Sequence, residues 1–203
     1  ICDSVVKYGG KFAPVVDGKI PYSPIEYYDK VAHDEWKSSL TGPERGAIAS
    51  WKGSAKSIRV AVATGDPNHA SATTAQKFMG AIERAKPHAG LTYRGISGEY
   101  ADGIAKQIAE AGVGGTWSDP SPHCMSIDQM VGRKFAMGKL LFRIQSLTGR
   151  PIHKEDGHEG EKEVVGMPKA LYRIAGIHKN VKVGGDQGQI VKHVIDLIEE
   201  LGQ

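Results

Sequence analysis

Three glutamates alternate in the stretch EGEKEVV, where Glu159, Glu161 and Glu163 stand at every second position ahead of two valines. Side chains of a β-strand share a face at every second residue, so a strand here would place Glu161 and Glu163 side by side. Two carboxylates at close range raise the pKa of one of them, which suits the pair to acid–base chemistry. The alternative interpretation is a solvated strand edge, where exposed charge is common.

Arg94, in the stretch TYRG, is a second candidate because it stands at the expected end of a short strand. Gly95 follows it and would let a ligand approach the backbone closely, since glycine has no Cβ. A guanidinium in such a place can hold a phosphate through two parallel hydrogen bonds. The alternative is an arginine with a surface or structural role.

Ser118, which follows Trp117 in TWSDPS, is the third candidate. Its alternative interpretation is a simple turn built on Asp119 and Pro120, both of which are common turn residues. The chain has no GxSxG motif, so the nucleophile elbow of the α/β-hydrolases is not supported.

The histidines and glycines form no recognised metal or mononucleotide motif. His153 and His158 fall in a loop-like stretch and His123 stands beside Cys124, but none has HExxH or zinc-site spacing. The glycine clusters fit neither GxGxxG nor the P-loop pattern. We therefore expect no metal centre and no Rossmann or P-loop fold.

The elements expected around these candidates are helices first, followed by strands mixed with helices. Helical spacing and capping signals, including Thr41 with Glu44 and Ser126 with Gln129, predict helices. These are expected at 24–40, 41–51, 54–63, 69–86, 99–112, 126–137 and from 189 onward. Short β-prone runs predict strands, at 91–95, 114–118, 139–144, 161–165 and 171–183. The stretch 146–160 is expected to be a loop.

The chain of 203 residues suits a single domain of the α+β class. We divide it into an irregular lead-in (1–22), a helical part (23–87) and a strand-rich part (88–203). Cys2 and Cys124 form neither a disulfide framework nor a CxxC site.

Composition limits the classes of partner. The formal net charge of +3 disfavours a nucleic acid partner and leaves it open. No apolar run approaches the roughly 18 residues that a transmembrane helix needs, so no membrane partner is expected. No signal peptide is expected either. The chain begins with Ile1, and we interpret it as a processed product or as a piece of a longer chain.

Four features in this order resemble the mono-ADP-ribosyltransferases of the Arg–Ser–Glu type. They are the stretch EWKSSLTGPERGAIASWKGSAKSI (35–58), the aromatic-Arg-Gly at Arg94, the serine after an aromatic at Ser118, and the Glu-x-Glu-Val run at 161–164. This family includes clostridial binary toxins, vertebrate ecto-enzymes and phage enzymes. The stretch 35–58 is similar to the helical lead-in of the toxin branch. The resemblance covers about residues 36 to 177.

The resemblance implies two roughly perpendicular small β-sheets with flanking helices, and NAD lying in the cleft between them. By the same resemblance, Arg94 holds the phosphates of NAD and the backbone of Gly95 contacts the nicotinamide amide. Ser118 would orient the catalytic carboxylate of Glu163. Glu161 is the residue that accompanies an arginine acceptor in this family.

The resemblance also implies NAD contacts for Tyr93 and Trp117, the aromatic residues that precede the two motif positions. The sequence departs from the pattern of this family at two places. Asp119 and Pro120 replace the second and third residues of the family's Ser-Thr-Ser. Arg59 falls near the place where the toxin branch has lead-in residues that touch NAD.

The expected activity is transfer of ADP-ribose from NAD to a protein acceptor, an arginine, with release of nicotinamide. The expected agent is a toxin, an effector or a phage-injected enzyme that acts in the cytoplasm of a target cell. Cleavage of the ribosyl bond develops oxocarbenium charge, which a carboxylate can stabilise. Two alternatives remain: an NAD glycohydrolase or a nucleic acid ADP-ribosyltransferase, and a degenerate fold that serves as a binding or virion structural module.

Overall fold

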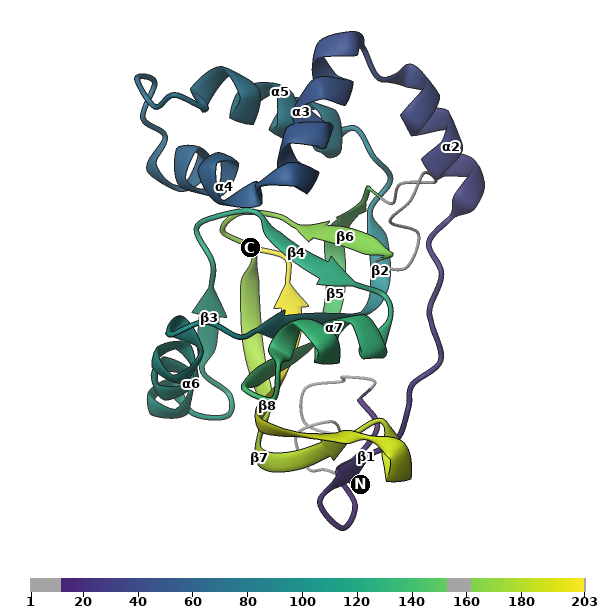
Figure 1. Ribbon diagram of the computed structural model, residues 1–203, viewed down its shortest axis with the longest axis vertical. Helices are drawn as coiled ribbons and strands as arrows, with labels where there is room; N and C mark the ends of the chain where they lie inside the picture. Colours follow the sequence, from purple (N-terminus) through teal and green to yellow (C-terminus); the bar gives the residue numbers. More distant parts are fainter. Residues whose placement is uncertain (1–11, 153–161, 203) are drawn as a thin grey trace.

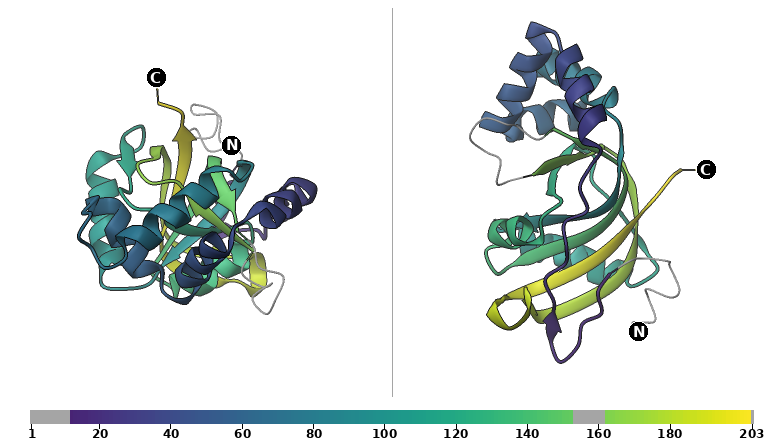
Figure 2. Two further views of the ribbon diagram at one scale, coloured as in Figure 1. Left: turned by 90° about the horizontal axis from the view of Figure 1, so that it is seen from above. Right: turned by 90° about the vertical axis from the view of Figure 1, so that its right-hand side faces the viewer.

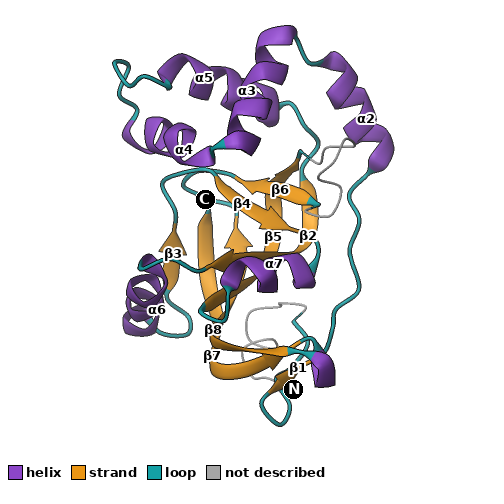
Figure 3. Cartoon of the chain, viewed as in Figure 1, coloured by secondary structure: helices purple, strands orange, loops and turns teal. Residues whose placement is uncertain are grey.

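A computed structural model of the protein describes residues 12–152 and 162–202 (Figure 1). Helices gather at one end of a curved β-sheet, and two more helices flank the sheet (Figures 1 and 3). The α+β class expected from the sequence is confirmed.

Four helices form what we call the helical unit: α2 (Lys30–Ser39), α3 (Gly42–Gly53), α4 (Ala55–Thr64) and α5 (Ala72–Glu83). Their apolar faces meet in a core that includes Trp36, Trp51 and Phe78. Val165 from the sheet and Ile152, which directly follows a strand, belong to the same core. The helical unit is therefore packed onto one end of the sheet through shared apolar contacts.

Capping residues decide where the first helices begin. The capping box predicted at Thr41 is confirmed, since its hydroxyl accepts from the N–H of Glu44 at 3.4 Å and its own N–H donates to the Glu44 carboxylate at 2.8 Å. Helix α2 is shorter than the predicted 24–40. It starts after Asp29, whose carboxylate accepts from the N–H of Ala32 at 3.1 Å and so satisfies the first turn.

Replacing Thr41 by alanine is expected to lower the free energy of unfolding by about 1 kcal/mol, because the first turn of α3 loses its side-chain acceptor. Urea denaturation at pH 7 measures the change. Ser50→Ala in the same helix is the control, since Ser50 only bonds back to the carbonyl of Gly46. We expect its effect to stay within about 0.5 kcal/mol. Equal losses in both variants would contradict the assigned cap.

The described residues form eight strands, which pair in the order β1-β7-β8-β5-β2-β4-β6, with β3 added on β7. Their bounds are β1 (Lys19–Ile20), β2 (His88–Ile96), β3 (Thr116–Ser118), β4 (His123–Ser126), β5 (Leu140–Pro151), β6 (Glu163–Gly166), β7 (Leu171–Val183) and β8 (Gln189–Glu200). β5 also pairs with β6. Hydrogen bonding thus links all of these strands into one sheet, which curves strongly (Figure 2).

Helix α6 (Tyr100–Ala111) matches its prediction, whereas α7 (Gln129–Ala136) begins later than predicted. The capping box predicted for Ser126 and Gln129 is wrong, because Ser126 is paired in the sheet as the last residue of β4. The cap is Asp128, whose carboxylate accepts from the N–H of Met130 at 2.9 Å. The hydroxyl of Ser126 accepts in turn from the N–H of Asp128 at 3.0 Å.

The helix predicted from residue 189 onward is wrong, since this segment is strand β8. The strand lies between β7 and β5, so neighbours cover it on both sides within the sheet. Apolar residues of both alternating sets, such as Val191, Val194 and Leu197, are buried. A strand buried on both faces needs no polar alternation, and its apolar residues can fall at helical spacing. β5 likewise extends to Pro151, into the stretch expected to be a loop.

Two further apolar cores lie along the sheet, one around Phe142 and Tyr172 and the other around Leu141 and Val181. Within residues 12–152 and 162–202, no helix has the length and apolar character needed to cross a membrane.

Candidate active site

A cavity of about 420 Å³ lies between the helical unit and the sheet. Its walls come from α3, α4, β2, β4, β6, α7 and the α3–α4 junction. The lining residues are Trp51, Lys52, Gly53, Ser54, Ala55, Arg59, Tyr93, Arg94, Gly95, Ile96, Cys124, Met125, Ser126, Val131, Gly132, Phe135 and Glu163. Five residues predicted from the sequence are in this set: Arg59, Tyr93, Arg94, Gly95 and Glu163.

Strand β4 connects the strand of Arg94 to the strand of Glu163. Tyr93 of β2 pairs with Ser126 of β4, and Ser126 pairs with Glu163 of β6. Adjacent strands lie about 4.8 Å apart, so two spacings separate β2 from β6 by roughly 10 Å. Residues that are far apart in the sequence therefore line one cavity, as the sequence predicted for Arg94 and Glu163.

The carboxylate of Glu163 is held from two directions. Nε1 of Trp51, on α3, donates to its Oε1 at 2.8 Å. The thiol of Cys124, on the adjacent strand β4, is hydrogen-bonded to the same side chain. Exclusion of bulk water around the sulfur raises the pKa of Cys124, and the charge of Glu163 raises it further, although the residue is exposed to the cavity. Cys124 is therefore protonated at neutral pH and acts as the donor.

Ser118, predicted to orient Glu163, does not line the cavity. It is exposed at the end of β3, where it pairs with Leu171 of β7. The chain turns after Ser118 and enters the strand next to β6 only at His123. On β4 the residue opposite Glu163 is Ser126, and the thiol of Cys124 also contacts the Glu163 side chain. Ser118 lies outside this arrangement, and the role predicted for it is corrected.

The two aromatic residues predicted to contact NAD have different surroundings. Trp117 is absent from the cavity wall, because its ring packs in the core against Phe142 and Tyr172 at centroid distances of 5.1 and 6.0 Å. Tyr93 lines the cavity but is almost fully buried. Burial raises the pKa of its phenol to about 12, so the Tyr93 side chain that lines the cavity is uncharged at neutral pH.

Gly95 is required for the packing of α7 on β2. A Cβ at this position would lie 2.2 Å from the backbone N of Ala136 and 2.2 Å from the carbonyl O of Gly132. The missing side chain therefore admits the helix backbone, where we had expected it to admit a ligand. Gly95 still lines the cavity, so a backbone contact with NAD stays a prediction.

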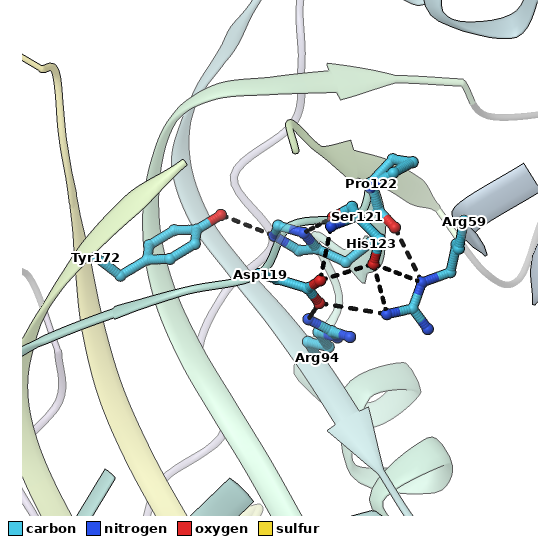
Figure 4. Close-up of polar contacts among 7 residues, drawn as sticks. All are labelled: Arg59, Arg94, Asp119, Ser121, Pro122, His123 and Tyr172. Carbon is cyan, nitrogen blue, oxygen red and sulfur yellow. Dashed lines mark hydrogen bonds and ion pairs between the residues drawn. The ribbon is translucent and has the colours of Figure 1, made fainter. Parts of the chain in front are cut away.

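Arg94 and Arg59 share the carboxylate of Asp119 (Figure 4). Nη1 of Arg94 donates to Oδ2 at 2.9 Å, and Nη2 of Arg59 donates to the same oxygen at 3.3 Å. The hydroxyl of Ser121 donates to Oδ1 at 2.6 Å and accepts from Nη2 of Arg59 at 3.0 Å. The network fixes two cationic side chains at the cavity, one from the sheet and one from the helical unit.

The protonation state of Asp119 follows from this network. Its burial alone would raise the pKa of the carboxyl group. The charge of Arg94 and the hydrogen bonds from Ser121 outweigh burial and lower the pKa of Asp119 to about 2. Asp119 is therefore ionised at neutral pH. Its charge offsets part of the desolvation cost of the buried Arg94 guanidinium.

His123 fixes the turn that carries Asp119 (Figure 4). Its Nδ1 lies 3.1 Å from the carbonyl O of Ser121 and its Nε2 lies 2.8 Å from the hydroxyl of Tyr172. A carbonyl oxygen only accepts, so Nδ1 carries the proton and Nε2 accepts from Tyr172. Burial, followed by the charge of Arg94, lowers the pKa of His123 to about 3.

The neutral state of His123 predicts a pH dependence of stability. The pKa of His123 is about 3 in the folded protein, against 6.5 for an unperturbed histidine, so the folded state binds fewer protons below pH 6.5. The stabilising contribution is present above pH 6.5 and is lost as the pH falls toward 3. Between pH 7 and 4.5 the loss is about 2 kcal/mol.

Urea denaturation of the wild type and of His123→Gln at several pH values measures this loss. The variant is expected to be less stable at pH 7 and to show a shallower decline with acid. Parallel declines would show that His123 does not contribute to the pH dependence.

Glu161, predicted to accompany an arginine acceptor, lies outside the described residues, as do His153 and His158. In the part of the chain that the structure describes, no group of three His, Cys, Asp or Glu side chains is placed to hold a metal ion.

No family model matches the sequence, and no curated protein matches it. Solved structures with a similar fold include ADP-ribosyltransferase toxins and the enzymatic component of a toxin. Their identities to this chain are low, so the similarity shows the fold: the chain has the fold of the ADP-ribosyltransferase toxins.

Three of these structures illustrate the match. The enzymatic component C2-I of the C2 toxin from Clostridium botulinum has a TM-score of 0.64 and 16% identity, over 85% of this chain and 46% of that one. Plx2a, an ADP-ribosyltransferase toxin from Paenibacillus larvae, has a TM-score of 0.63 and 17% identity, over 85% and 92%. Exoenzyme S from Pseudomonas aeruginosa, solved with human 14-3-3 protein beta and carba-NAD, has a TM-score of 0.59 and 16% identity, over 86% and 84%. The chain thus spans about half the length of C2-I.

Sequence reasoning missed two contacts of Glu163. Trp51 lay inside the stretch 35–58 that carried the resemblance, but no pattern assigned its indole to a carboxylate. The sequence around Cys124 has neither a disulfide pattern nor a metal motif, and nothing in it points to a carboxylate partner. Both contacts depend on which strands and helices meet, and local sequence does not show this.

Proposed function

We propose that this protein transfers ADP-ribose from NAD to an arginine of a target protein and releases nicotinamide. The observation that carries the proposal is one cavity with Arg94 and Arg59 on one side and Glu163 on another, in the fold of the ADP-ribosyltransferase toxins. Its volume of about 420 Å³ falls within the range usual for small-molecule sites. Exoenzyme S, with a similar fold, binds an NAD analogue, which supports NAD as the substrate.

The arginine pair would bind the pyrophosphate of NAD. A guanidinium has five N–H donors in a fixed plane, so Arg94 can hold Asp119 with one nitrogen and a phosphate oxygen with another. Asp119 keeps the guanidinium oriented before the dinucleotide arrives. Arg59 adds a second positive charge from α4, close to the same carboxylate.

Glu163 would stabilise the transition state. The bond between ribose C1′ and the nicotinamide nitrogen breaks, and its electron pair neutralises the positive charge of the nicotinamide ring. The ribose then carries oxocarbenium charge, which an oriented carboxylate stabilises. The acceptor nitrogen attacks C1′ and loses a proton. We assign two roles to Glu161: it accepts that proton and it binds the acceptor guanidinium. The reason is its place two residues before Glu163.

The proposed biological role is that of a toxin or effector that modifies a protein of a target cell. Its support is the fold shared with C2-I, the enzymatic component of a toxin, and with Plx2a, an ADP-ribosyltransferase toxin.

The test is incubation of the protein with NAD labelled in its adenylate phosphate and with a cell lysate. We expect label in protein, and mass spectrometry is expected to locate it on arginine. Label recovered as free ADP-ribose would instead indicate a glycohydrolase, and label in RNA or DNA would indicate a nucleic acid acceptor. Absence of both turnover and calorimetric NAD binding would favour a binding module and overturn the proposal.

A further inference from the structure

We infer that Trp51 is a positioning residue for the proposed reaction, because its indole N–H fixes the Glu163 carboxylate from the helical unit. This inference rests on the proposed function. Nε1 of Trp51 lies 2.8 Å from Oε1 of Glu163. Trp51 is 2% exposed and Glu163 is 8% exposed, so the hydrogen bond forms largely away from bulk water.

The indole is a rigid donor. Its ring stacks on Phe78 of α5 with centroids 4.5 Å apart and planes 14° from parallel. Both residues belong to the core of the helical unit, which surrounds the ring. Rotation of the indole would break this stack, so the direction of the N–H is set by packing. A carboxylate bound to such a donor inherits a defined orientation.

The hydrogen bond acts on one oxygen of the catalytic group. Trp51 holds Oε1, which restricts rotation of the carboxylate about its terminal bond. The thiol of Cys124 contacts the same side chain from β4. A negative charge that is already oriented stabilises developing positive charge without reorganisation during the reaction. An N–H donor also favours the ionised over the protonated carboxyl group.

This contact joins two parts of the fold at the reacting centre. Trp51 belongs to α3 and stacks on Phe78 of α5, whereas Glu163 is the first residue of β6 in the sheet. Val165, two residues along β6, packs in the same core as Trp51. The helical unit therefore contributes directly to the geometry of the proposed catalytic carboxylate, in addition to forming a cavity wall.

Trp51→Phe tests the inference, because phenylalanine keeps a ring to stack on Phe78 and removes the N–H donor. Trp36→Phe is the matched control. Trp36 is also buried in the helical unit, and its Nε1 donates to the carbonyl O of Ala81 at 2.7 Å, but it does not line the cavity. Each variant loses one buried indole hydrogen bond, so we expect similar decreases in the urea midpoint.

The two variants are expected to differ in kinetics. Initial rates of label transfer into a fixed amount of lysate, measured against NAD concentration, give apparent kcat and KM. Trp51→Phe is expected to lower kcat by roughly 10- to 100-fold, the equivalent of one hydrogen bond to a charged group. Its KM for NAD is expected to change by less than about threefold, since the phosphate-binding side is intact. Trp36→Phe is expected to keep both constants near wild type.

The dependence of kcat on pH is a further measurement, and a loss of stability alone does not change it. Without the indole donor, the catalytic carboxylate is protonated more readily, so the acidic limb of the kcat profile is expected to shift to higher pH in Trp51→Phe. Trp36→Phe is expected to follow the wild-type profile. Equal kcat and coincident profiles in the two variants, with Glu163→Gln inactive, would overturn the inference and leave the proposed function standing. Wild-type transfer by Glu163→Gln would overturn the proposed function itself.

Discussion

Glu163→Gln is expected to lower the rate of ADP-ribose transfer by roughly 100- to 1000-fold, the cost typical of removing one preorganised charge-stabilising group. Glutamine has nearly the same shape, and its amide oxygen can still accept from Nε1 of Trp51. The substitution therefore removes the negative charge and leaves the packing in place. The apparent KM for NAD is expected to change little, because the carboxylate acts chiefly on the transition state.

Glu199→Gln is the matched control for this result. Glu199 is also a buried glutamate, and its carboxylate accepts from the backbone N–H groups of Leu147 and Thr148. It does not line the cavity. This variant is expected to lose stability and to keep its transfer rate per folded molecule. A similar loss of rate in both variants would show that the effect of Glu163→Gln reflects folding.

Arg94→Lys is expected to lower kcat/KM for NAD by about 100-fold, although the charge is retained. Arg94 is 8% exposed, and its guanidinium donates to Asp119 through Nη1. A lysine ammonium is a compact charge on a flexible stem and cannot span Asp119 and a phosphate in one plane. We expect the loss to appear in KM and in the calorimetric affinity for NAD, with a smaller change in kcat.

Arg173→Lys is the control for Arg94→Lys. Arg173 forms a fork-shaped pair with Glu200, with both N–O distances at 2.9 Å, and it does not line the cavity. Its replacement removes a guanidinium–carboxylate pair elsewhere on the sheet. Transfer and NAD affinity are expected to stay at wild-type values. If Arg94→Lys bound NAD as well as Arg173→Lys, the phosphate-binding role of Arg94 would be wrong.

Short-range signals were enough for most of the helical unit. The spacing of Thr41 and Glu44 predicted a cap that the structure confirms, and helical spacing predicted the helix at 69–86 in which α5 lies. The same reasoning failed for β8, whose apolar residues at helical spacing belong to a strand covered by β5 and β7. Periodicity reports which residues are buried, and it is ambiguous where both faces of an element are buried.

The sequence predicted those residues of the proposed site that a local motif marks. Arg94 at a strand end and Glu163 before two valines were found from the sequence, and the structure places them in one cavity. Ser118 was chosen because it follows an aromatic residue, but β3 ends there and pairs with β7. The thiol that contacts Glu163 is that of Cys124, and only the pairing of β4 with β6 brings these two strands together.

The sequence by itself determined the α+β class, the helical first part and the chemical types gathered at the cavity: two guanidiniums and a carboxylate. These follow from local propensity and from side-chain chemistry, which each residue carries wherever it lies. Only the tertiary structure decided that Asp119 neutralises Arg94 and that Trp51 and Cys124 hold Glu163. Such contacts join residues distant in sequence, and they arise from strand pairing and helix packing that depend on the whole chain at once.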